Sequence, residues 1–259
     1  MKPFSIFVCL VAFIVSSNAT DYCSKSICNY VKGVTHIACG NNGKFSQNCE
    51  PDAAMVTVTE SMKQLLIEGH NEKRNIVAGG GVSHLKPACR MATMQWDDEL
   101  ASVAAYNVKQ CKMQHDKCRN TDKFQYSGQN LAVMGFYGEV NNTARITQSI
   151  GLWFEEEKYT KQAFIDKYPK NYSGPQIGHF TVMMADRNIR LGCAISTYSV
   201  ADKPYTSYLL ACNYATTNMI NFPIYATCDK PATFCKTGTN PKYPNLCSNA
   251  ESYNVNKWF

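Results

Sequence analysis

Apolar positions recur with the 3.6-residue period of a helix in three stretches of the chain. Thr57 and Glu60 can form a capping box at the start of the first stretch, and Asp97 can cap the second. The third stretch begins at Asn142 or Thr143. The sequence therefore predicts three amphipathic helices. Their recurring positions are Met62, Leu65, Leu66, Gly69 and Ile76, then Leu100, Val103, Ala104, Asn107, Val108 and Cys111, and finally Ile146, Ile150, Trp153 and Glu157.

Two later stretches alternate between apolar and polar residues, as a half-buried strand does. A turn-forming segment at residues 201–204 separates them, so together they predict an antiparallel hairpin. Residues 127–133 form a shorter extended segment earlier in the chain. Because the helices precede the hairpin, the pattern favours a mixed α+β sandwich. The alternating positions are Ile189, Leu191, Cys193 and Ile195 in one strand, and Tyr208, Leu210, Cys212 and Tyr214 in the other.

Residues 1–19 have the composition of a secretory signal peptide. Lys2 supplies a positive start, residues 4–15 are almost wholly apolar, and Ser17-Asn18-Ala19 offers a small-residue cleavage site. We therefore expect the mature chain to begin at Thr20 and to be exported. No later stretch approaches the roughly 18 apolar residues of a membrane span, so we expect no transmembrane segment.

Cysteine usage agrees with export. The chain has 13 cysteines, and removing Cys9 with the signal peptide leaves an even number, as expected for a disulfide framework. The Cys-x-x-Cys and His-x-x-x-His spacings of a zinc site are absent, so disulfides are the better interpretation. We thus divide the chain into the signal peptide (1–19), a cysteine-rich N-terminal extension (20–55), a main domain (56–220) and a cysteine-containing C-terminal extension (221–259).

Charge and short motifs narrow the choice of partners. The net charge of +6 comes from Lys and Arg residues that are scattered along the chain, so we expect no nucleic-acid partner. The Asn-x-Ser/Thr sequons at Asn141 and Asn171 make these two residues the candidate N-glycosylation sites of an exported chain.

Three places in the chain carry candidate chemistry. His179 stands at the head of the apolar run Gly178–Met184, where an imidazole can bind a metal, move a proton or make a structural hydrogen bond. His115 lies between two cysteines, whose disulfides would hold its loop in place. The acids Glu155–Glu157 end the third helix, and such a run is usually solvated, with one member able to turn inward.

Two sequence signatures resemble those of a known family. Gly178–Thr181 is similar to the first signature of the CAP superfamily, which includes cysteine-rich secretory proteins, insect antigen 5 and plant pathogenesis-related 1 proteins. Leu209–Tyr214 is similar to the second signature. Gly128–Ala132 and the early cysteines resemble the insect antigen 5 branch, and residues 215–219 with the cysteine-rich tail look most like antigen 5 of fly saliva. The resemblance implies a three-layer α-β-α sandwich of the α+β class, with a central cleft and disulfide-stapled extensions.

The resemblance also implies a cleft tetrad of two histidines and two acids. His115 and His179 match the histidines, and Glu156 matches one acid by its offset of three from Trp153. Gln129 replaces the other acid, as in the antigen 5 branch. An amide cannot take a catalytic proton at ordinary pH. The two imidazoles can hold zinc or copper, but two protein ligands are too few for a tight site, so we expect weak binding and no obligatory cofactor. Binding should fade as the pH falls towards about 6, because it needs deprotonated imidazoles.

A disulfide pattern follows from the same resemblance. The pairs that the family implies are Cys23 with Cys39, Cys28 with Cys118, Cys49 with Cys111 and Cys193 with Cys212. Proximity in the sequence then pairs Cys235 with Cys247 and leaves Cys89 with Cys228, although spacing alone allows other pairings of these four.

This scaffold without a complete catalytic set favours a secreted, non-enzymatic salivary protein that binds host molecules and is allergenic to the host. We expect a monomer whose partners are host proteins or small hydrophobic ligands such as lipids and sterols. One alternative is a metal-dependent hydrolase acting through His179 and Glu156, although the chain has no Gly-x-Ser-x-Gly nucleophile motif. The other is a receptor or platelet antagonist, although no Arg-Gly-Asp sequence is present.

Overall fold

The computed structural model describes residues 20–28 and 33–257, so the expected signal peptide lies outside the described residues. Its centre is a five-stranded sheet in the order β1-β4-β5-β3, with β2 pairing to β4 off this path. The strands are β1 (Ala54–Val56), β2 (Gln95–Trp96), β3 (Gly128–Phe136), β4 (Arg190–Ser199) and β5 (Thr206–Tyr214). The helices are α1 (Glu60–Ala78), α2 (Asp98–Val108), α3 (Asn142–Phe154), the 3-10 helix η1 (Glu155–Tyr159), α4 (Gln162–Asp166) and α5 (Gly178–Met184).

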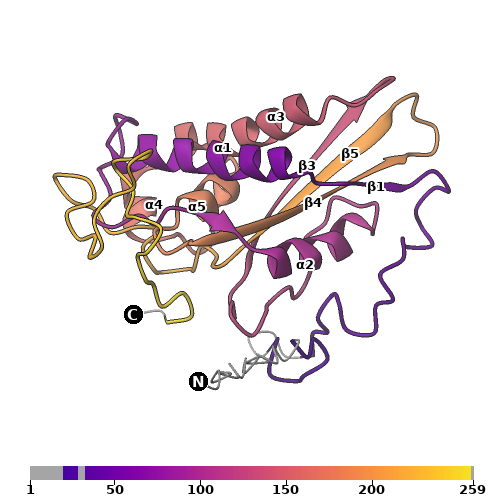
Figure 1. The fold of residues 1–259 in the computed structure, drawn as a ribbon, viewed down its shortest axis with the longest axis horizontal. Helices are drawn as coiled ribbons and strands as arrows, with labels where there is room; N and C mark the ends of the chain where they lie inside the picture. Colours follow the sequence, from indigo (N-terminus) through magenta and orange to yellow (C-terminus); the bar gives the residue numbers. More distant parts are fainter. Residues whose placement is uncertain (1–19, 29–32, 258–259) are drawn as a thin grey trace, which may run out of the picture.

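Helices cover both faces of the sheet (Figure 1). The helices α1 and α3 lie on one face and α2 lies on the other. Successive side chains of a strand point to opposite faces, so Ile195 and Leu210 pack with α1 and α3. Ala194 and Ala211, each one position along, pack against α2 instead. The predicted three-layer α+β sandwich is therefore confirmed.

The predicted hairpin is present with its register. Strands β4 and β5 pair antiparallel, and Cys193 lies opposite Cys212, to which it is joined by a disulfide. The extended segment expected at residues 127–133 is longer than its sequence pattern indicated, because β3 pairs with β5 as far as Phe136. The pattern stops early because β3 is the edge strand of the sheet, and Val133 is exposed there.

The start of α1 differs from the sequence prediction. The N-cap is Thr59, whose hydroxyl accepts a hydrogen bond from the Met62 amide at 3.3 Å. Thr57 therefore forms no capping box with Glu60, because a cap must directly precede the first helical residue to reach an amide of the first turn. The other two helices also end earlier than expected, since Cys111 lies beyond α2 and Glu157 lies in η1.

The inward face of α1 is more polar than its pattern indicated. Ile76, which was expected on the apolar face, is 42% exposed, whereas His70, Asn71 and Arg74 are buried. His70 donates through Nδ1 to the Leu66 carbonyl at 2.7 Å, so its Nε2 accepts from the Tyr214 hydroxyl at 2.8 Å. A helical-period count misses such residues because it scores polar side chains as solvent-facing.

Buried His70 should make the protein sensitive to acid. Burial lowers the pKa of His70 from 6.5 to about 4, so the unfolded chain takes up a proton that the folded chain refuses between these values. Stability is therefore complete above pH 6.5 and is lost as the pH falls towards 4, by about 3 kcal/mol. Denaturant unfolding between pH 6.5 and 4 measures this effect. The free energy of unfolding should fall more steeply with decreasing pH in wild type than in His70→Gln. Asn71→Gln, a buried neighbour that does not titrate, should lower stability equally at every pH, and an unchanged slope in His70→Gln would contradict the assignment.

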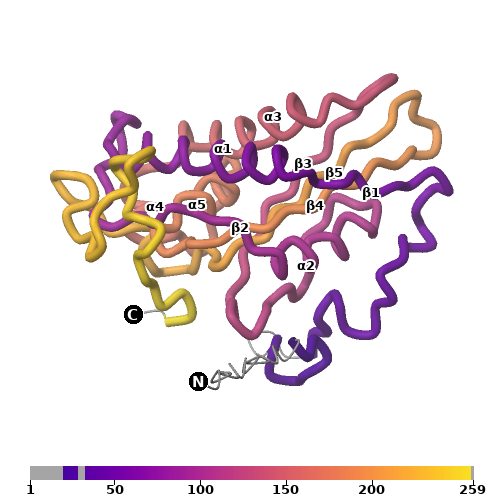
Figure 2. Tube along the Cα trace, in the orientation of Figure 1, coloured from indigo at the N-terminus to yellow at the C-terminus, as the bar shows by residue number. Residues whose placement is uncertain are grey.

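The two extensions lie at opposite ends of the molecule (Figure 2). The N-terminal extension runs beneath α2 before it joins β1, and the C-terminal extension winds across the far end near α4. The extensions hold little regular structure, so covalent links supply much of their order. The disulfides join Cys23–Cys39, Cys28–Cys118, Cys49–Cys111, Cys89–Cys228, Cys193–Cys212 and Cys235–Cys247, the pairs expected from the sequence.

Candidate functional site

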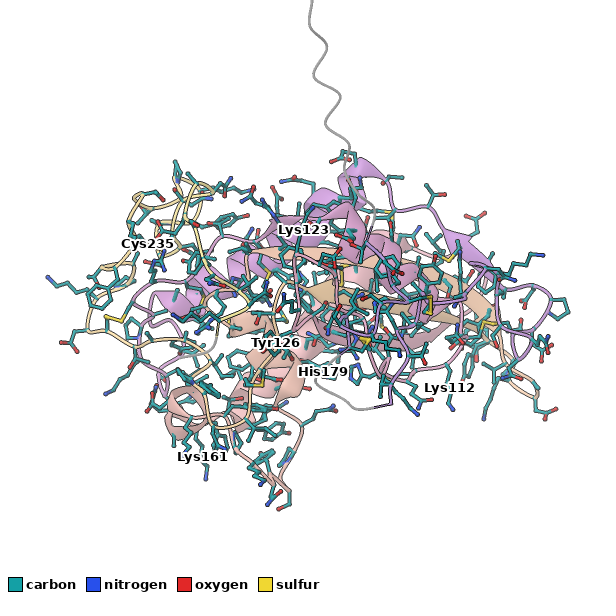
Figure 3. The ribbon with its side chains drawn as sticks, turned by 90° about the horizontal axis from the view of Figure 1, so that it is seen from below. Lys112, Lys123, Tyr126, Lys161, His179 and Cys235 are labelled. Carbon is teal, nitrogen blue, oxygen red and sulfur yellow. A yellow bond between two sulfur atoms is a disulfide. The ribbon has the colours of Figure 1, made fainter. Side chains whose placement is uncertain are left out.

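A cleft of ≈ 320 Å³ lies where α5, the start of β3 and the loop after α2 meet. His179 is labelled at this place in Figure 3. The structure brings both predicted histidines and Gln129 to the wall of the cleft, while Glu156 lies behind His179. The lining residues are His115, Arg119, Gln129, Asn130, Tyr168, Gln176, Gly178, His179, Val182, Thr217 and Asn218.

His179 is held by the buried carboxylate of Glu156. The His179 ring lies with Nδ1 at 2.6 Å from Glu156 Oε1, and the other oxygen of Glu156 accepts from the His179 amide at 2.8 Å and the Phe180 amide at 3.1 Å. These amides belong to the first turn of α5, where helical N–H groups have no partner inside the helix. Trp153 stacks on the ring, with centroids 6.2 Å apart. The single inward acid expected within Glu155–Glu157 is thus Glu156.

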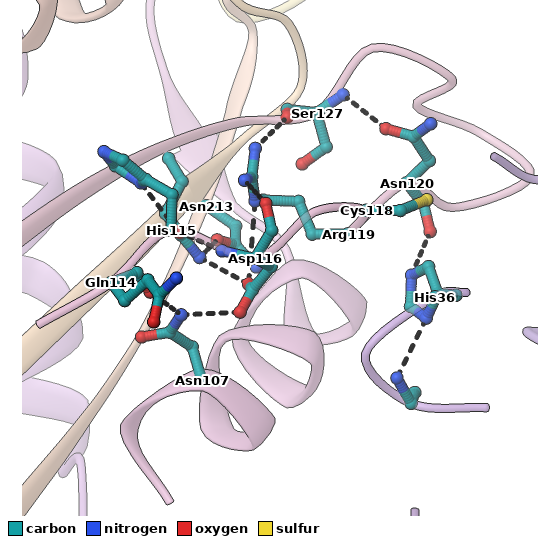
Figure 4. A network of polar contacts seen from close by, with 12 residues as sticks. His36, Asn107, Gln114, His115, Asp116, Cys118, Arg119, Asn120, Ser127 and Asn213 are labelled. Carbon is teal, nitrogen blue, oxygen red and sulfur yellow. Dashed lines mark hydrogen bonds and ion pairs between the residues drawn. The ribbon is translucent and has the colours of Figure 1, made fainter. Parts of the chain in front are cut away.

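His115 is held by Gln129 through an amide relay. Figure 4 shows His115 with Asp116 and Asn213, the two residues that orient this amide. The Gln129 Nε2 group donates to Asp116 Oδ2 at 2.7 Å and to Asn213 Oδ1 at 3.0 Å. This orients the amide so that its Oε1 faces His115 Nδ1 at 2.9 Å and accepts the imidazole proton. The neutral residue at the acid position therefore fixes the tautomer of His115.

Asp116 and Arg119 belong to the site but were not singled out from the sequence. Besides Gln129, the Asp116 carboxylate accepts from Asn107 Nδ2 at 2.6 Å and lies 3.6 Å from Arg119 Nε. Arg119 also donates to the Ser127 carbonyl at 3.1 Å. Their positions in the sequence could have drawn attention to them, because Asp116 follows His115 and Arg119 follows the half-cystine Cys118. The sequence shows that Gln129 replaces an acid, but it does not show that the Asp116 carboxylate lies directly behind this glutamine.

The loop that carries His115 is fixed from both sides. Cys49–Cys111 anchors its start to the N-terminal extension, and Cys28–Cys118 anchors its end. His36 of the extension adds a hydrogen bond from its Nε2 to the Asn120 carbonyl at 2.9 Å, because its Nδ1 accepts from the Ala38 amide. The extension thus braces the cleft, which is consistent with the need to hold a ligand histidine in place.

Both cleft histidines present the nitrogen that a metal would need. Their Nδ1 atoms are engaged by Gln129 and Glu156, and no residue in the described parts of the chain bonds either Nε2. Partial burial is the main cause that lowers the pKa of His115 below its ordinary value. No cluster of three or more His, Cys, Asp or Glu residues that could hold a metal occurs within residues 20–28 and 33–257. Two imidazoles alone supply fewer protein ligands than the four of a tight structural zinc site.

The two candidate glycosylation sites lie on the surface of the protein. Asn141 is exposed and caps α3, since its Oδ1 accepts from the Ala144 amide at 3.0 Å and leaves Nδ2 for a glycan. Asn171 is exposed in the loop between α4 and α5 with a φ of 61°. Both remain predictions of glycan attachment.

The chain is similar to several secreted allergens. The model of the cysteine-rich secretory protein family, CAP, matches residues 67–214. The chain is 41% identical to Venom allergen-1 of Aedes aegypti, over 93% of this chain and 92% of that protein. It is 43% identical to Antigen 5 like allergen Cul n 1 of Culicoides nubeculosus, over 75% of this chain and 89% of that one.

Solved structures show the same fold at lower identity. A crystal structure of NaASP2 with Zn2+ superposes with a TM-score of 0.62 at 24% identity, over 77% of this chain and all of that chain. Na-ASP-1 superposes with a TM-score of 0.61 at 25% identity, over 79% of this chain and 50% of that chain.

Proposed function

Because this chain belongs to the cysteine-rich secretory protein (CAP) family, we propose that it is a non-enzymatic salivary binding protein that takes up host effector molecules and is allergenic to the host. Its venom-allergen and antigen 5 relatives, together with its disulfides, make it a secreted protein. No helix in the described ranges is long and apolar enough to cross a bilayer.

The observation that carries this proposal is the amide at position 129. Hydrogen bonds hold Gln129 between His115, Asp116 and Asn213. Its amide does not titrate at ordinary pH, so it cannot act as a general base or a general acid. All cysteines in the described residues are in disulfides, and no serine lines the cleft. A rigid scaffold with a polar cleft but no activated nucleophile supports binding over turnover.

Native mass spectrometry of the protein purified from saliva tests this function. A binding protein should carry a small host ligand, or acquire a ligand or protein partner after incubation with host plasma. Hydrolytic turnover that disappears in His179→Ala would instead support the metal-dependent hydrolase, for which the 2.6 Å contact between Glu156 and His179 is the favouring observation.

We further propose that the cleft holds zinc or copper in exchangeable form through the Nε2 atoms of His115 and His179. Bound there, the metal would supply a Lewis-acidic centre for a polar ligand group. Gln129 and Glu156 support this role because each fixes an imidazole through the nitrogen opposite the metal-binding one.

Zinc titration should locate this site. By isothermal calorimetry near neutral pH, His115→Gln and His179→Gln should each weaken zinc binding at least about tenfold, since each removes one of two ligands. Glu156→Gln should weaken it by about 10- to 100-fold through the lost orientation of His179. His84→Gln, outside the cleft, is the matched control and should bind zinc as wild type does. Equal zinc affinity in all four variants would exclude this site.

A further inference from the structure

A second cavity adjoins the cleft where the N-terminal extension meets the main domain. It has a volume of ≈ 280 Å³, and Arg119 and Thr217 line both it and the cleft. We call this second cavity the annex. Its other walls include the Cys28–Cys118 disulfide, Met219 and Tyr126, which is labelled in Figure 3.

Buried hydrogen bonds hold the walls of the annex in place. Asn120 donates to the Ile27 carbonyl at 2.9 Å and accepts from the Ser127 amide at 3.1 Å. One side chain thus ties the extension, the His115 loop and the segment before β3 together. The annex is therefore preformed, as small-molecule sites usually are.

The annex and the cleft differ in chemistry. The cleft is lined mainly by imidazoles, amides and hydroxyls, whereas the annex adds a disulfide, a tyrosine ring and a methionine to its own amides and hydroxyls. Each cavity alone lies near the lower end of the roughly 300–1,000 Å³ of ligand sites, and the two together provide ample room for one small molecule. A ligand that fills both must have an apolar body and a polar group.

The charged residues that line the two cavities indicate which polar group the ligand carries. Lys117 and Arg119 are the only charged residues among those lining the annex and the cleft in the described chain, apart from the histidines. The nearby carboxylates of Asp116 and Glu156 lie behind the wall and accept hydrogen bonds from the protein. The buried Nε of Arg119 lies 3.6 Å from Asp116 Oδ2, an ion-pair distance beyond hydrogen-bond range, and has no hydrogen-bond acceptor within the described residues. These groups favour an anion at the boundary between the two cavities.

We infer that the annex binds a small amphipathic organic anion. Its carboxylate or sulfonate lies between Lys117 and Arg119, and its aromatic or aliphatic body packs against Tyr126 and Met219. The inference rests on the proposed binding function and names the ligand class that this function would serve.

Fluorescence titration with 8-anilinonaphthalene-1-sulfonate tests the inference on the disulfide-intact mature chain. The probe should bind saturably with one site per chain. The uncharged analogue N-phenyl-1-naphthylamine has nearly the same aromatic body and should bind at least about fivefold more weakly. Met219→Trp fills the annex and should weaken sulfonate binding at least about tenfold, whereas Met55→Trp, on β1, should not.

A second pair of variants isolates the charge. Lys117→Gln should weaken sulfonate binding about threefold or more, and Lys112→Gln, an exposed lysine on the same loop, should leave it unchanged (Figure 3). Unsaturable binding, or equal affinity in wild type and Met219→Trp, would overturn the inference. Zinc titration separates this inference from the proposed zinc site. If Met219→Trp loses probe binding but keeps wild-type zinc affinity, the annex is a separate site, as inferred. If wild type binds zinc but does not bind the probe, the annex inference fails while the zinc proposal stands.

Discussion

Replacing Arg74 with methionine should lower the free energy of unfolding by about 3–5 kcal/mol, because it leaves several buried carbonyl acceptors without a donor, at about 1–3 kcal/mol each. The Arg74 side chain is fully buried and donates to four backbone carbonyls. Its Nε and Nη2 bond the Ala92 carbonyl at 3.1 and 2.7 Å, and Nη1 bonds the Met183 and Ala185 carbonyls at 2.6 and 2.9 Å. A further bond from Nη2 reaches the Asp186 carbonyl at 3.3 Å.

Methionine fills much of the same volume, so the loss reports on the hydrogen bonds more than on a cavity. Burial lowers the pKa of Arg74 to about 10, and the guanidinium still carries its charge at neutral pH. Met183 lies in the last turn of α5 and Ala185 is its C-cap, whereas His179 lies in the first turn of the same helix, so zinc affinity should fall together with stability.

Guanidinium chloride unfolding, monitored by tryptophan fluorescence, measures the change. Lys73→Met is the matched control on the same helix, because Lys73 is half-buried and its ammonium group lies over the Phe154 ring, 4.7 Å from the ring centroid. That variant should lose less than about 1 kcal/mol. A loss of similar size in both variants would mean that the Arg74 network contributes little.

Gly192→Ala should destabilise the protein by about 3 kcal/mol or more, at the upper end of overpacking effects. A methyl group at Gly192 would lie 2.2 Å from the Ala101 nitrogen and 2.3 Å from the Asp97 oxygen. Both are backbone atoms of the first turn of α2, which cannot move without lifting the helix from β4. Gly192 also pairs with Asn213, an acceptor of the Gln129 amide, so the shift should reach the cleft.

Gly151→Ala is the matched control for the same chemical change. Gly151 lies inside α3, and an added methyl group there meets no atom within 4 Å. This variant should gain about 0.5–1 kcal/mol, because alanine loses less backbone entropy than glycine in a helix. Thermal unfolding by circular dichroism compares the two, and a similar loss in both would contradict the close approach of α2 to β4.

Much of the fold was predictable because its signals are local. The alternation in β4 and β5, the cap at Asp97, and the start of α3 at Asn142 with its amphipathic period each depend on neighbours in the chain. The α1 face was mispredicted for the opposite reason. The Tyr214 hydroxyl stabilises buried His70 and distant backbone carbonyls stabilise buried Arg74, and no local pattern shows these partners.

Some residues of the candidate site were likewise predictable from local motifs, and others were not. His115, Gln129, Glu156 and His179 were identified from motifs, and three of them line one cleft with the fourth directly behind. Asp116 and Arg119 were missed because their roles depend on the side-chain orientation of Gln129. The annex could not be foreseen, since its walls come from residues 28, 117–120, 125–127, 217 and 219, which only the disulfides and loop contacts bring together.

The sequence by itself determined the secreted character, the disulfide-rich α+β family scaffold and the amide that replaces a cleft acid, because each is written in residue type and spacing. Only the tertiary structure decided that Gln129 is locked against Asp116, that both Nδ1 atoms are occupied, and that a second cavity opens beside His115. Hydrogen-bond direction and cavity shape depend on distances between segments far apart in the chain, and these distances are fixed only when the layers pack.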